Sequence, residues 1–294
     1  MTIKDLIQQA TSQFTDSDTA KLDAQLLLAD VLGKDRTWLM TWNDLDVDDT
    51  DRQQFAAMVA RRARGEPIAH ILGFREFWGL TLECNASTLI PRPETELLVE
   101  KALELDLPGD ARVLDLGTGT GAIALALASE RPDWQIEAVD FSAEAIALAK
   151  RNGKNLGINN VEFSQSDWFA SLKPAHQFDL IVSNPPYVDP GSPYLNMGDV
   201  RFEPRSALIA DKAGLADIEY IAANAPRFLK TDGVRVKIYS DPKFPDSGSG
   251  WLMVEHGYEQ AGPVAELFRS AGFGQIRYHN DLAGWPRITL GKLG

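Results

Sequence analysis

The stretch "ARVLDLGTGTGAIALALASE" (Ala111–Glu130) combines a short apolar run, a glycine-rich turn and an apolar helix. "ARVLDLG" is typical of a strand that is buried on both faces. Gly117, Gly119 and Gly121 follow it, and glycine permits positive φ and close approach of a ligand to the backbone. "AIALALASE" predicts a helix, whose free N-terminal amides attract an anionic group. The stretch therefore predicts a strand–loop–helix unit that binds a ligand.

Strands and helices continue to alternate after this unit. The expected strands are "QIEAVD", "VEFSQSD", "FDLIVSN" and "GWLMVEHG", and the expected helices include "AEAIALAKRNGKNLG" and "GPVAELFRSAG". "QIRYHND" and "RITLGK" near the C-terminus predict two antiparallel strands. This alternation favours an α/β domain over residues 91–294, with a mostly parallel sheet, helices on both faces and an antiparallel C-terminal hairpin. Such sheets bind their ligand at the carboxyl ends of the strands.

The chain before this domain has a different character. Residues 1–73 predict a small helical domain, in which "AKLDAQLLLADVLG" has apolar residues at a helical period and a natural stop at Gly33. "GEPIAHILGFREFWGLTLECN" is richer in aromatic and β-branched residues and has Gly79 at a turn, so residues 74–90 predict a β-hairpin linker. "RRAR" (Arg61–Arg64) is the one basic cluster; it predicts a solvated helix end or, alternatively, a contact with a small anion or RNA.

Composition restricts the function further. The chain has 294 residues, 44% hydrophobic and 24% charged, as expected of a soluble globular protein with two domains. Its net charge of −13 argues against broad nucleic-acid binding, which needs a basic face. One cysteine excludes an internal disulfide, and the four histidines lack metal-ligand spacing, so no metal is expected. Without a secretory signal or a run of about 20 apolar residues, the expected location is the cytoplasm, away from membranes.

Two acids accompany the glycine loop. Asp115 lies at the end of the first strand, and Asp140 closes the next strand, where a carboxylate can accept hydrogen bonds from both ribose hydroxyls. Nicotinamide enzymes share this arrangement. The spacing here, however, is GxGxG preceded by an acid rather than GxGxxG, and no diphosphate-binding pattern follows. The remaining alternative is a structural turn followed by an acid that has no role.

A second motif, "NPPY" (Asn184–Tyr187), ends the strand "FDLIVSN". Proline lacks an N–H and fixes φ, and it holds the preceding residue extended, so the turn is rigid. We expect it to aim the Asn184 side chain and the Pro185 carbonyl into the ligand cleft, where two acceptors suit a substrate –NH2 group. Tyr187 would supply an aromatic face for a planar amide or base. A strand cap with an incidental tyrosine is the alternative.

"DLGTGTG" resembles the S-adenosylmethionine loop of methyltransferases. The resemblance implies that the helix start faces the methionine carboxylate, and that Asp167 and Trp168 of "SDWF" flank the adenine. A tryptophan at a strand end is also common in protein cores. The cofactor-binding residues implied are Gly117, Thr118, Gly119, Thr120, Gly121, Asp140, Asp167, Trp168 and Asn184.

The motif NPPY marks methyltransferases that act on planar –NH2 groups. "PRPETELLVE", "DLGTGTGAIALALA", "FDLIVSNPPYV", "EPRSALIA" and "VEHGYEQ" together resemble the bacterial methyltransferases that modify the glutamine of peptide chain release factors. This resemblance covers essentially the whole chain. It implies S-adenosylmethionine-dependent methylation of the side-chain amide nitrogen in the Gly-Gly-Gln motif, with the N-terminal helices docking the release factor. Asn184, Pro185 and Tyr187 would be catalytic, and these three with Pro186 would bind the substrate.

Two rival functions remain open from sequence. An exocyclic-amine methyltransferase acting on DNA or RNA would share NPPY, but it would require a basic groove or a target-recognition domain. A non-catalytic protein that senses the cofactor is the other rival.

Two further segments of the sequence lead to structural expectations. Arg92 and Glu94 of "PRPETE" would either shape the substrate entrance or belong to an ordinary helix start. "VRVKIYSDPKFPDSGS" (Val234–Ser249) departs from the family pattern and predicts a surface loop opposite the cleft, without effect on catalysis.

Overall fold

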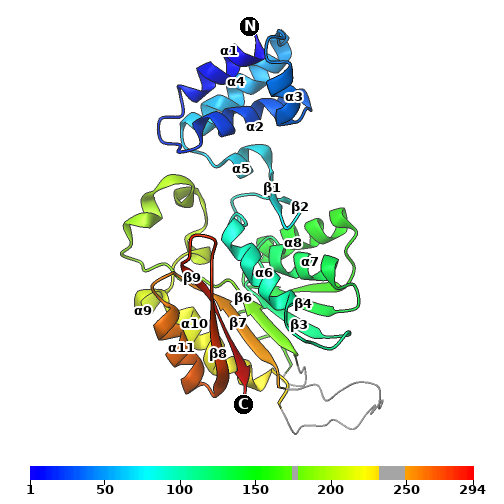
Figure 1. Cartoon of the computed structure of the whole chain (residues 1–294), viewed down its shortest axis with the longest axis vertical. Coiled ribbons are helices and arrows are strands. Elements are labelled where there is room, and N and C mark those ends of the chain that lie inside the picture. The colour runs from blue at the N-terminus through cyan, green and yellow to red at the C-terminus, as the bar shows by residue number, and fades with distance from the viewer. Residues whose placement is uncertain (174–177, 232–248) are drawn as a thin grey trace. The chain divides into compact units, whose positions relative to one another are not determined.

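A computed structural model describes residues 1–173, 178–231 and 249–294 (Figure 1). The chain divides into two compact units. The first comprises Met1–Phe74, Cys84–Ala86 and Pro193–Glu203, and the second comprises Arg75–Glu83, Ser87–Ser192 and Pro204–Gly294. The loop predicted at residues 234–249 lies outside the described residues except for Ser249.

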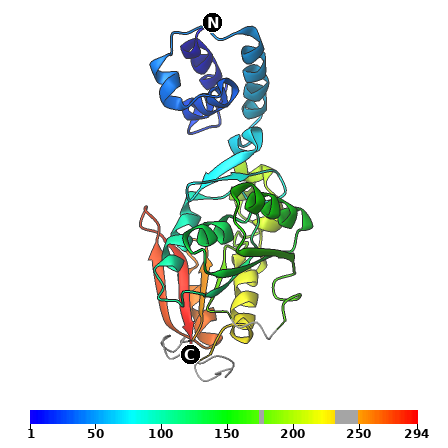
Figure 2. The same ribbon diagram turned by 90° about the vertical axis from the view of Figure 1, so that its right-hand side faces the viewer.

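The N-terminal part of the first unit, Met1–Phe74, is mainly a helical bundle, blue to cyan in Figures 1 and 2. Its helices are α1 (Ile3–Thr11), α2 (Ala20–Leu32), α3 (Arg36–Thr41), α4 (Asp49–Ala63) and α5 (Ile68–Leu72). The predicted helical domain is thus present, and α2 ends at Gly33 (φ +60°) as expected. Thr2 and Asp5 form a capping box at the start of α1. The apolar faces of these helices share one core, which includes Leu6, Leu28 and Phe55.

The first unit also contains a segment distant in sequence, Pro193–Glu203, with the 3₁₀ turns η2 (Pro193–Asn196) and η3 (Gly198–Phe202). Arg62 holds it, donating from Nη1 to Asp199 at 2.9 Å and from Nε to Asp23 at 2.8 Å. The Arg62 side chain is only 10% exposed. The prediction that the basic cluster is a solvated helix end is therefore wrong at Arg62, whose charge is neutralised by two carboxylates inside the unit.

Two strands, β1 (Phe74–Phe77) and β2 (Leu80–Glu83), form the two-stranded sheet that the sequence predicts. Gly79 (φ +70°) makes the turn. Asn152 of α8 (Ala143–Leu156), itself buried, fastens β2 within the second unit, because its Oδ1 accepts from the Glu83 amide at 2.7 Å and its Nδ2 donates to the Glu83 carbonyl at 3.1 Å.

The second unit is built on a seven-stranded sheet of order β5-β4-β3-β6-β7-β9-β8. The strands are β3 (Arg112–Leu116), β4 (Gln135–Asp140), β5 (Val161–Gln165), β6 (Leu180–Ser183), β7 (Trp251–Glu255), β8 (Phe273–Asn280) and β9 (Pro286–Leu293). The pairs from β5 through β7 are parallel, whereas β9 is antiparallel to both β7 and β8. This is the predicted sheet with its C-terminal hairpin, which lies at one edge of the sheet (orange to red in Figure 2).

Helices cover both faces of this sheet. They are α6 (Glu96–Leu103), α7 (Ala122–Glu130), α8 (Ala143–Leu156), α10 (Ala216–Asn224) and α11 (Ala261–Ser270), and α9 (Asp211–Gly214) is a short turn. Side chains alternate along each strand, so Val113 and Met253 join the core with α6, α7 and α8, whereas Leu114 and Leu252 join the core with α10 and α11. Within the described ranges, no helix is long and apolar enough to cross a bilayer.

Strand order reverses beside β3, since β4 and β5 lie to one side of it and β6 and β7 to the other. In an open α/β sheet this reversal opens a crevice beyond the carboxyl ends of the central strands. The loops after β3 and β6 are the glycine loop and the NPPY turn, so the topology brings both motifs to that crevice.

Candidate functional site

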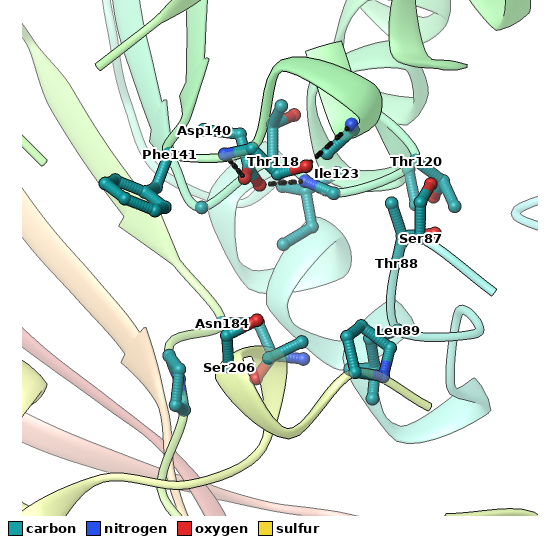
Figure 3. A pocket seen from close by; sticks show the side chains of 18 of the residues that line it. Ser87, Thr88, Leu89, Thr118, Thr120, Ile123, Asp140, Phe141, Asn184 and Ser206 are labelled. Atoms are coloured by element: carbon teal, nitrogen blue, oxygen red, sulfur yellow. Dashed lines mark hydrogen bonds between the residues drawn. The ribbon is translucent and has the colours of Figure 1, made fainter. Parts of the chain in front are cut away.

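A pocket of about 270 Å³ lies at this crevice, within the second unit (Figure 3). Loops after β3, β4, β5 and β6 line it together with the segment before α6. Nine residues predicted from the sequence are among the lining: Gly117, Thr118, Gly119, Thr120, Asp140, Asp167, Trp168, Asn184 and Pro186. In Figure 3, Asn184 and Ser206 lie across the pocket from Thr118 and Asp140.

The glycine loop is fastened to β4. The amides of Gly117 and Thr118 both donate to the Val139 carbonyl at 2.9 Å, and Gly119 donates to Asp140 Oδ2 at 2.9 Å. Gly117 and Gly119 have φ of +72° and +57°, a backbone region that favours glycine. A Cβ at Gly119 would have only Thr88 within 4 Å among the described atoms, so this stretch of backbone stays open to a ligand.

Asp140 is held by backbone donors on both oxygens. Oδ1 accepts from the Ser142 amide and Oδ2 from the Gly119 amide, each at 2.9 Å (Figure 3). Burial raises the pKa of Asp140, and these two amide bonds act in the opposite direction. The carboxylate is therefore fixed in orientation at the pocket wall, where its remaining lone pairs can accept from ligand hydroxyls.

Asp115 lies beneath the loop rather than at the pocket. It is fully buried, and its Oδ2 accepts from the Thr118 hydroxyl at 2.7 Å. Burial raises the pKa of Asp115 to about 7, against the effect of the Thr118 hydrogen bond. Asp115 thus supports the conformation of the loop from below.

Gly121 was predicted to bind the cofactor, but the described pocket lining does not include it. It has φ of +84°, and a Cβ there would lie 3.1 Å from Leu125, 3.2 Å from Ala149 and 3.3 Å from Phe163. The glycine is thus explained by close packing of α7 against α8 and β5. Asn152 of α8 adds a hydrogen bond to the Thr120 carbonyl at 2.9 Å, which fixes the end of the loop.

Trp168 and Asp167 both line the pocket at the end of β5. Trp168 has φ of +47°, which is costly for a bulky residue, and its ring lies 3.6 Å from the position that a Gly117 Cβ would take. Strain of this kind concentrates at ligand sites. The arrangement is compatible with a flat apolar ligand group beside the indole, while Asp167 remains exposed to solvent.

The NPPY turn contributes an amide whose acceptor is unused. Asn184 Nδ2 donates to Thr95 Oγ1 at 3.0 Å, whereas Asn184 Oδ1 is buried and has no hydrogen-bond partner among the described residues. A buried amide oxygen without a partner is costly unless something else supplies a donor. Because Asn184 and Pro186 line the pocket, that donor can come from a bound molecule.

The described lining does not include the other two residues of this motif, Pro185 and Tyr187. Pro185 is buried and Tyr187 is half-buried. The Tyr187 hydroxyl donates to Glu255 Oε1 at 3.3 Å, and the Tyr187 carbonyl accepts from Gln260 at 3.1 Å. The expected contact of the Tyr187 ring with a substrate therefore stays a prediction.

Sequence reasoning missed several residues of the site. Thr88, Leu89, Phe141, Ser206 and Asp217 also line the pocket. Phe141 carries a usable signal in the sequence, because it is an aromatic residue directly after the strand-end acid Asp140. In the structure its side chain is 70% exposed. Of the two candidates in "PRPETE", Arg92 lines the pocket, whereas Glu94 is exposed and outside the described lining. Pro93 begins the 3₁₀ turn η1 (Pro93–Thr95) before α6, which is the position of proline in an ordinary helix start.

The deeper residues could not be found from single motifs. Glu255 lies at the carboxyl end of β7 and is only 1% exposed, and its carboxyl group accepts a hydrogen bond from the Tyr187 hydroxyl. Burial raises the pKa of Glu255 to about 7, and a hydrogen bond from Thr95 is the largest influence that lowers it. The sequence shows Glu255 only as the acid of "VEHG", with no indication that its carboxyl group is buried beside Tyr187.

Comparison with known proteins gives matches over both units. Residues 5–73 match the family model of the PrmC N-terminal domain, and residues 93–199 match that of the methyltransferase small domain. The release factor glutamine methyltransferase of Pseudomonas aeruginosa is 50% identical over 281 residues, which is 96% of this chain and 95% of that protein. That of Salmonella typhimurium is 47% identical over 286 residues, 97% of each chain.

A solved structure shares the fold. The methyltransferase from Pyrococcus furiosus matches with a TM-score of 0.52 at 18% identity, covering 81% of this chain and 99% of that one. At this identity the match concerns architecture alone. The full-length similarity to curated relatives goes further: the chain belongs to the family of release factor glutamine methyltransferases.

Proposed function

We propose that this protein transfers a methyl group from S-adenosylmethionine to the side-chain amide nitrogen of the glutamine in the Gly-Gly-Gln motif of peptide chain release factors. Family membership supports the reaction. The observation that carries it is Asn184, whose buried Oδ1 lacks a partner among the described residues while its Nδ2 is held by Thr95. A fixed acceptor in a ligand pocket suits a substrate that offers an N–H group.

The pocket residues fit the methyl donor. Gly117 and Gly119 would allow it close to the backbone, Asp140 would accept from its ribose hydroxyls, and Trp168 with Asp167 would flank its adenine. When bound, S-adenosylmethionine supplies an electrophilic methyl group on a positively charged sulfur. Acidic side chains in the lining suit this positive charge.

Asn184 and the Pro185 carbonyl would prepare the acceptor nitrogen. An amide nitrogen is a poor nucleophile because its lone pair is delocalised into its carbonyl group. Two acceptors that hold both N–H bonds favour a localised lone pair and stabilise the positive charge that develops on nitrogen. The methylated nitrogen is more acidic and can lose its proton afterwards, so this scheme requires no strongly basic side chain.

Partner and location follow from this substrate. The N-terminal helices are our candidate for the surface that docks the release factor, and the cytoplasm is the compartment that we propose. Direct nucleic-acid binding is not expected, since the chain carries a net charge of −13.

The test is incubation with methyl-labelled S-adenosylmethionine and purified release factor, followed by mass spectrometry of the peptide that contains the Gly-Gly-Gln motif. We expect one added methyl group on the glutamine side chain and none on a release factor in which that glutamine is alanine. A parallel arm offers DNA and RNA. Methyl incorporation into nucleic acid alone would overturn the proposal in favour of an exocyclic-amine methyltransferase.

A further inference from the structure

A second buried polar atom in the pocket wall is without a hydrogen-bond partner. Five buried side-chain atoms lack a partner in the described part of the chain, and two of them belong to residues that line the pocket. One is Asn184 Oδ1, the acceptor for the substrate nitrogen in the proposed function. The other is the hydroxyl oxygen of Thr88, a residue that is only 3% exposed. Thr88 lies between β2 and η1, outside both ligand motifs of the sequence.

The hydroxyl group of Thr88 is not explained by packing. A buried hydroxyl without a partner is unfavourable, because folding removes its hydrogen bonds to water and supplies none in return. Valine has nearly the same shape as threonine and would fill the position without this cost. The hydroxyl therefore suits a hydrogen-bonding group that the pocket receives from a bound molecule.

Thr88 lies beside the open part of the glycine loop. A Cβ at Gly119 would be 3.9 Å from the Thr88 Cβ, so a ligand that approaches the Gly119 backbone also approaches Thr88. In Figure 3, Asp140 and Phe141 lie at one end of the pocket, whereas Thr88 and Leu89 lie at the other. Thr88 is thus at the far end from the carboxylate to which we assign the ribose.

The shape of the cofactor decides which of its groups reaches this end. In S-adenosylmethionine the sulfur joins an adenosine part to an amino-acid part. With the ribose at Asp140, the amino-acid part extends away from Asp140 and towards Thr88. Ala122 and Ile123 at the start of α7 also line the pocket, and the first amides of a helix favour an anionic group, here the carboxylate of the amino-acid part. A hydroxyl that donates to a carboxylate forms a charge-assisted hydrogen bond.

We infer that Thr88 is a cofactor-binding residue, whose hydroxyl group donates a hydrogen bond to the carboxylate of the amino-acid part of S-adenosylmethionine. The direction of the cofactor in the pocket rests on the role proposed for Asp140. The identity of the methyl acceptor does not enter, so the inference holds for a release factor and for any other amine.

Calorimetric titration with two ligands tests this contact. S-adenosylhomocysteine, the product form of the cofactor, has the amino-acid part, and 5′-methylthioadenosine lacks it. Thr88→Val keeps the shape but removes the hydroxyl, so the Kd for S-adenosylhomocysteine should rise about 10- to 100-fold. The Kd for 5′-methylthioadenosine should change less than about threefold, and Thr88→Ser should bind both ligands within about threefold of the original protein. Asp140→Ala is the control, because it should weaken the binding of both ligands.

A third ligand distinguishes the carboxylate from the amino group. Decarboxylated S-adenosylmethionine keeps the amino group, so Thr88→Val should change its Kd less than about threefold. A loss as large as that for S-adenosylhomocysteine would place the contact at the amino group and overturn the assignment. Equal weakening of S-adenosylhomocysteine and 5′-methylthioadenosine, or unchanged binding of both, would overturn the inference altogether.

Thermal melting separates ligand binding from support of the fold. Removing an unpaired buried hydroxyl should leave the Tm of unliganded Thr88→Val equal to or above that of the original protein, while S-adenosylhomocysteine should raise the Tm less. A purely structural role would instead lower the Tm without ligand. Should Thr88→Val not fold, Thr88→Ala carries the same expectations for the three ligands. These titrations need no methyl acceptor, so they remain decisive even if release factor is not methylated.

Discussion

At the scale of single residues, Asn184 and Asp140 lie on opposite sides of one pocket (Figure 3), and their substitution should affect different steps, turnover in one case and cofactor binding in the other. Asn184→Ala removes an acceptor that matters most in the transition state, so we expect kcat to fall about 10²–10³-fold with little change in cofactor affinity. In the role that we propose for Asp140, Asp140→Ala would remove hydrogen bonds to the ribose of the cofactor and should weaken cofactor binding about 10- to 100-fold. Calorimetric titration and steady-state kinetics measure the two quantities. The opposite pattern would mean that the two roles are exchanged.

The buried carboxyl group of Asp115 should make the free energy of unfolding depend on pH. Its pKa is raised by burial from 3.8 to about 7, so the folded protein retains a proton there that the unfolded chain releases. The free energy of unfolding should therefore decrease as pH rises from about 4 to about 7. Asp115→Asn cannot ionise, yet its amide oxygen can still accept from Thr118.

This substitution should gain stability relative to the original protein as pH rises, by up to about 4 kcal/mol. Urea unfolding of both proteins at pH 5 and pH 8 measures the difference, and taking that difference removes the contribution of other titrating groups. A gap that stays constant between the two pH values would show that Asp115 is charged in the folded state.

At the scale of the element, Gly121 at the start of α7 is closely packed against its neighbours. Gly121→Ala would bring a Cβ to 3.1–3.3 Å from Leu125, Ala149 and Phe163 at a φ of +84°. Gly157→Ala is a matched control, because Gly157 has φ of +69° and nothing within 4 Å.

The control carries only the backbone cost of about 1 kcal/mol, whereas Gly121→Ala adds overpacking of about 1–3 kcal/mol. Chemical denaturation measures both variants. Equal losses would show that α7 and α8 can move apart without cost, and that the glycine is needed for another reason.

The elements themselves could be predicted because their signals are local. Apolar strands that alternate with helices predict the parallel sheet, and a glycine loop or a proline pair after a strand locates the ligand loops. The place of Thr95 in the pocket lining and the burial of Glu255 at the end of β7 could not be predicted, since neither residue stands out from its neighbours in the sequence. Gly121 shows that a residue inside a binding motif can also be required for packing, and its predicted contact with the cofactor stays a prediction.

At the scale of the whole molecule, segment Pro193–Glu203 groups with the N-terminal helices although it follows NPPY in the sequence. Short 3₁₀ turns carry no hydrophobic period, so nothing local indicates which core they join. Its ionic contact with the helices is half-buried, since the Arg62 side chain is 10% exposed and the Asp199 side chain 39%. Arg62 lies between Asp23 and Asp199 and also donates to the Glu66 carbonyl at 3.1 Å.

Arg62→Ala should therefore loosen this segment and destabilise the first unit. Removing one partner of a buried ion pair leaves uncompensated charge, here on Asp23 above all, and costs about 3–5 kcal/mol. Arg52→Ala is the matched control on the same helix, because Arg52 pairs with the exposed carboxylate of Asp49 and such surface pairs contribute at most about 1 kcal/mol. Hydrogen exchange of the amides in Gly198–Phe202 should accelerate in the first variant and stay unchanged in the second. If exchange there is unaffected while the helices are destabilised, η3 is held by its apolar contacts, and the ion pair serves the helical bundle alone.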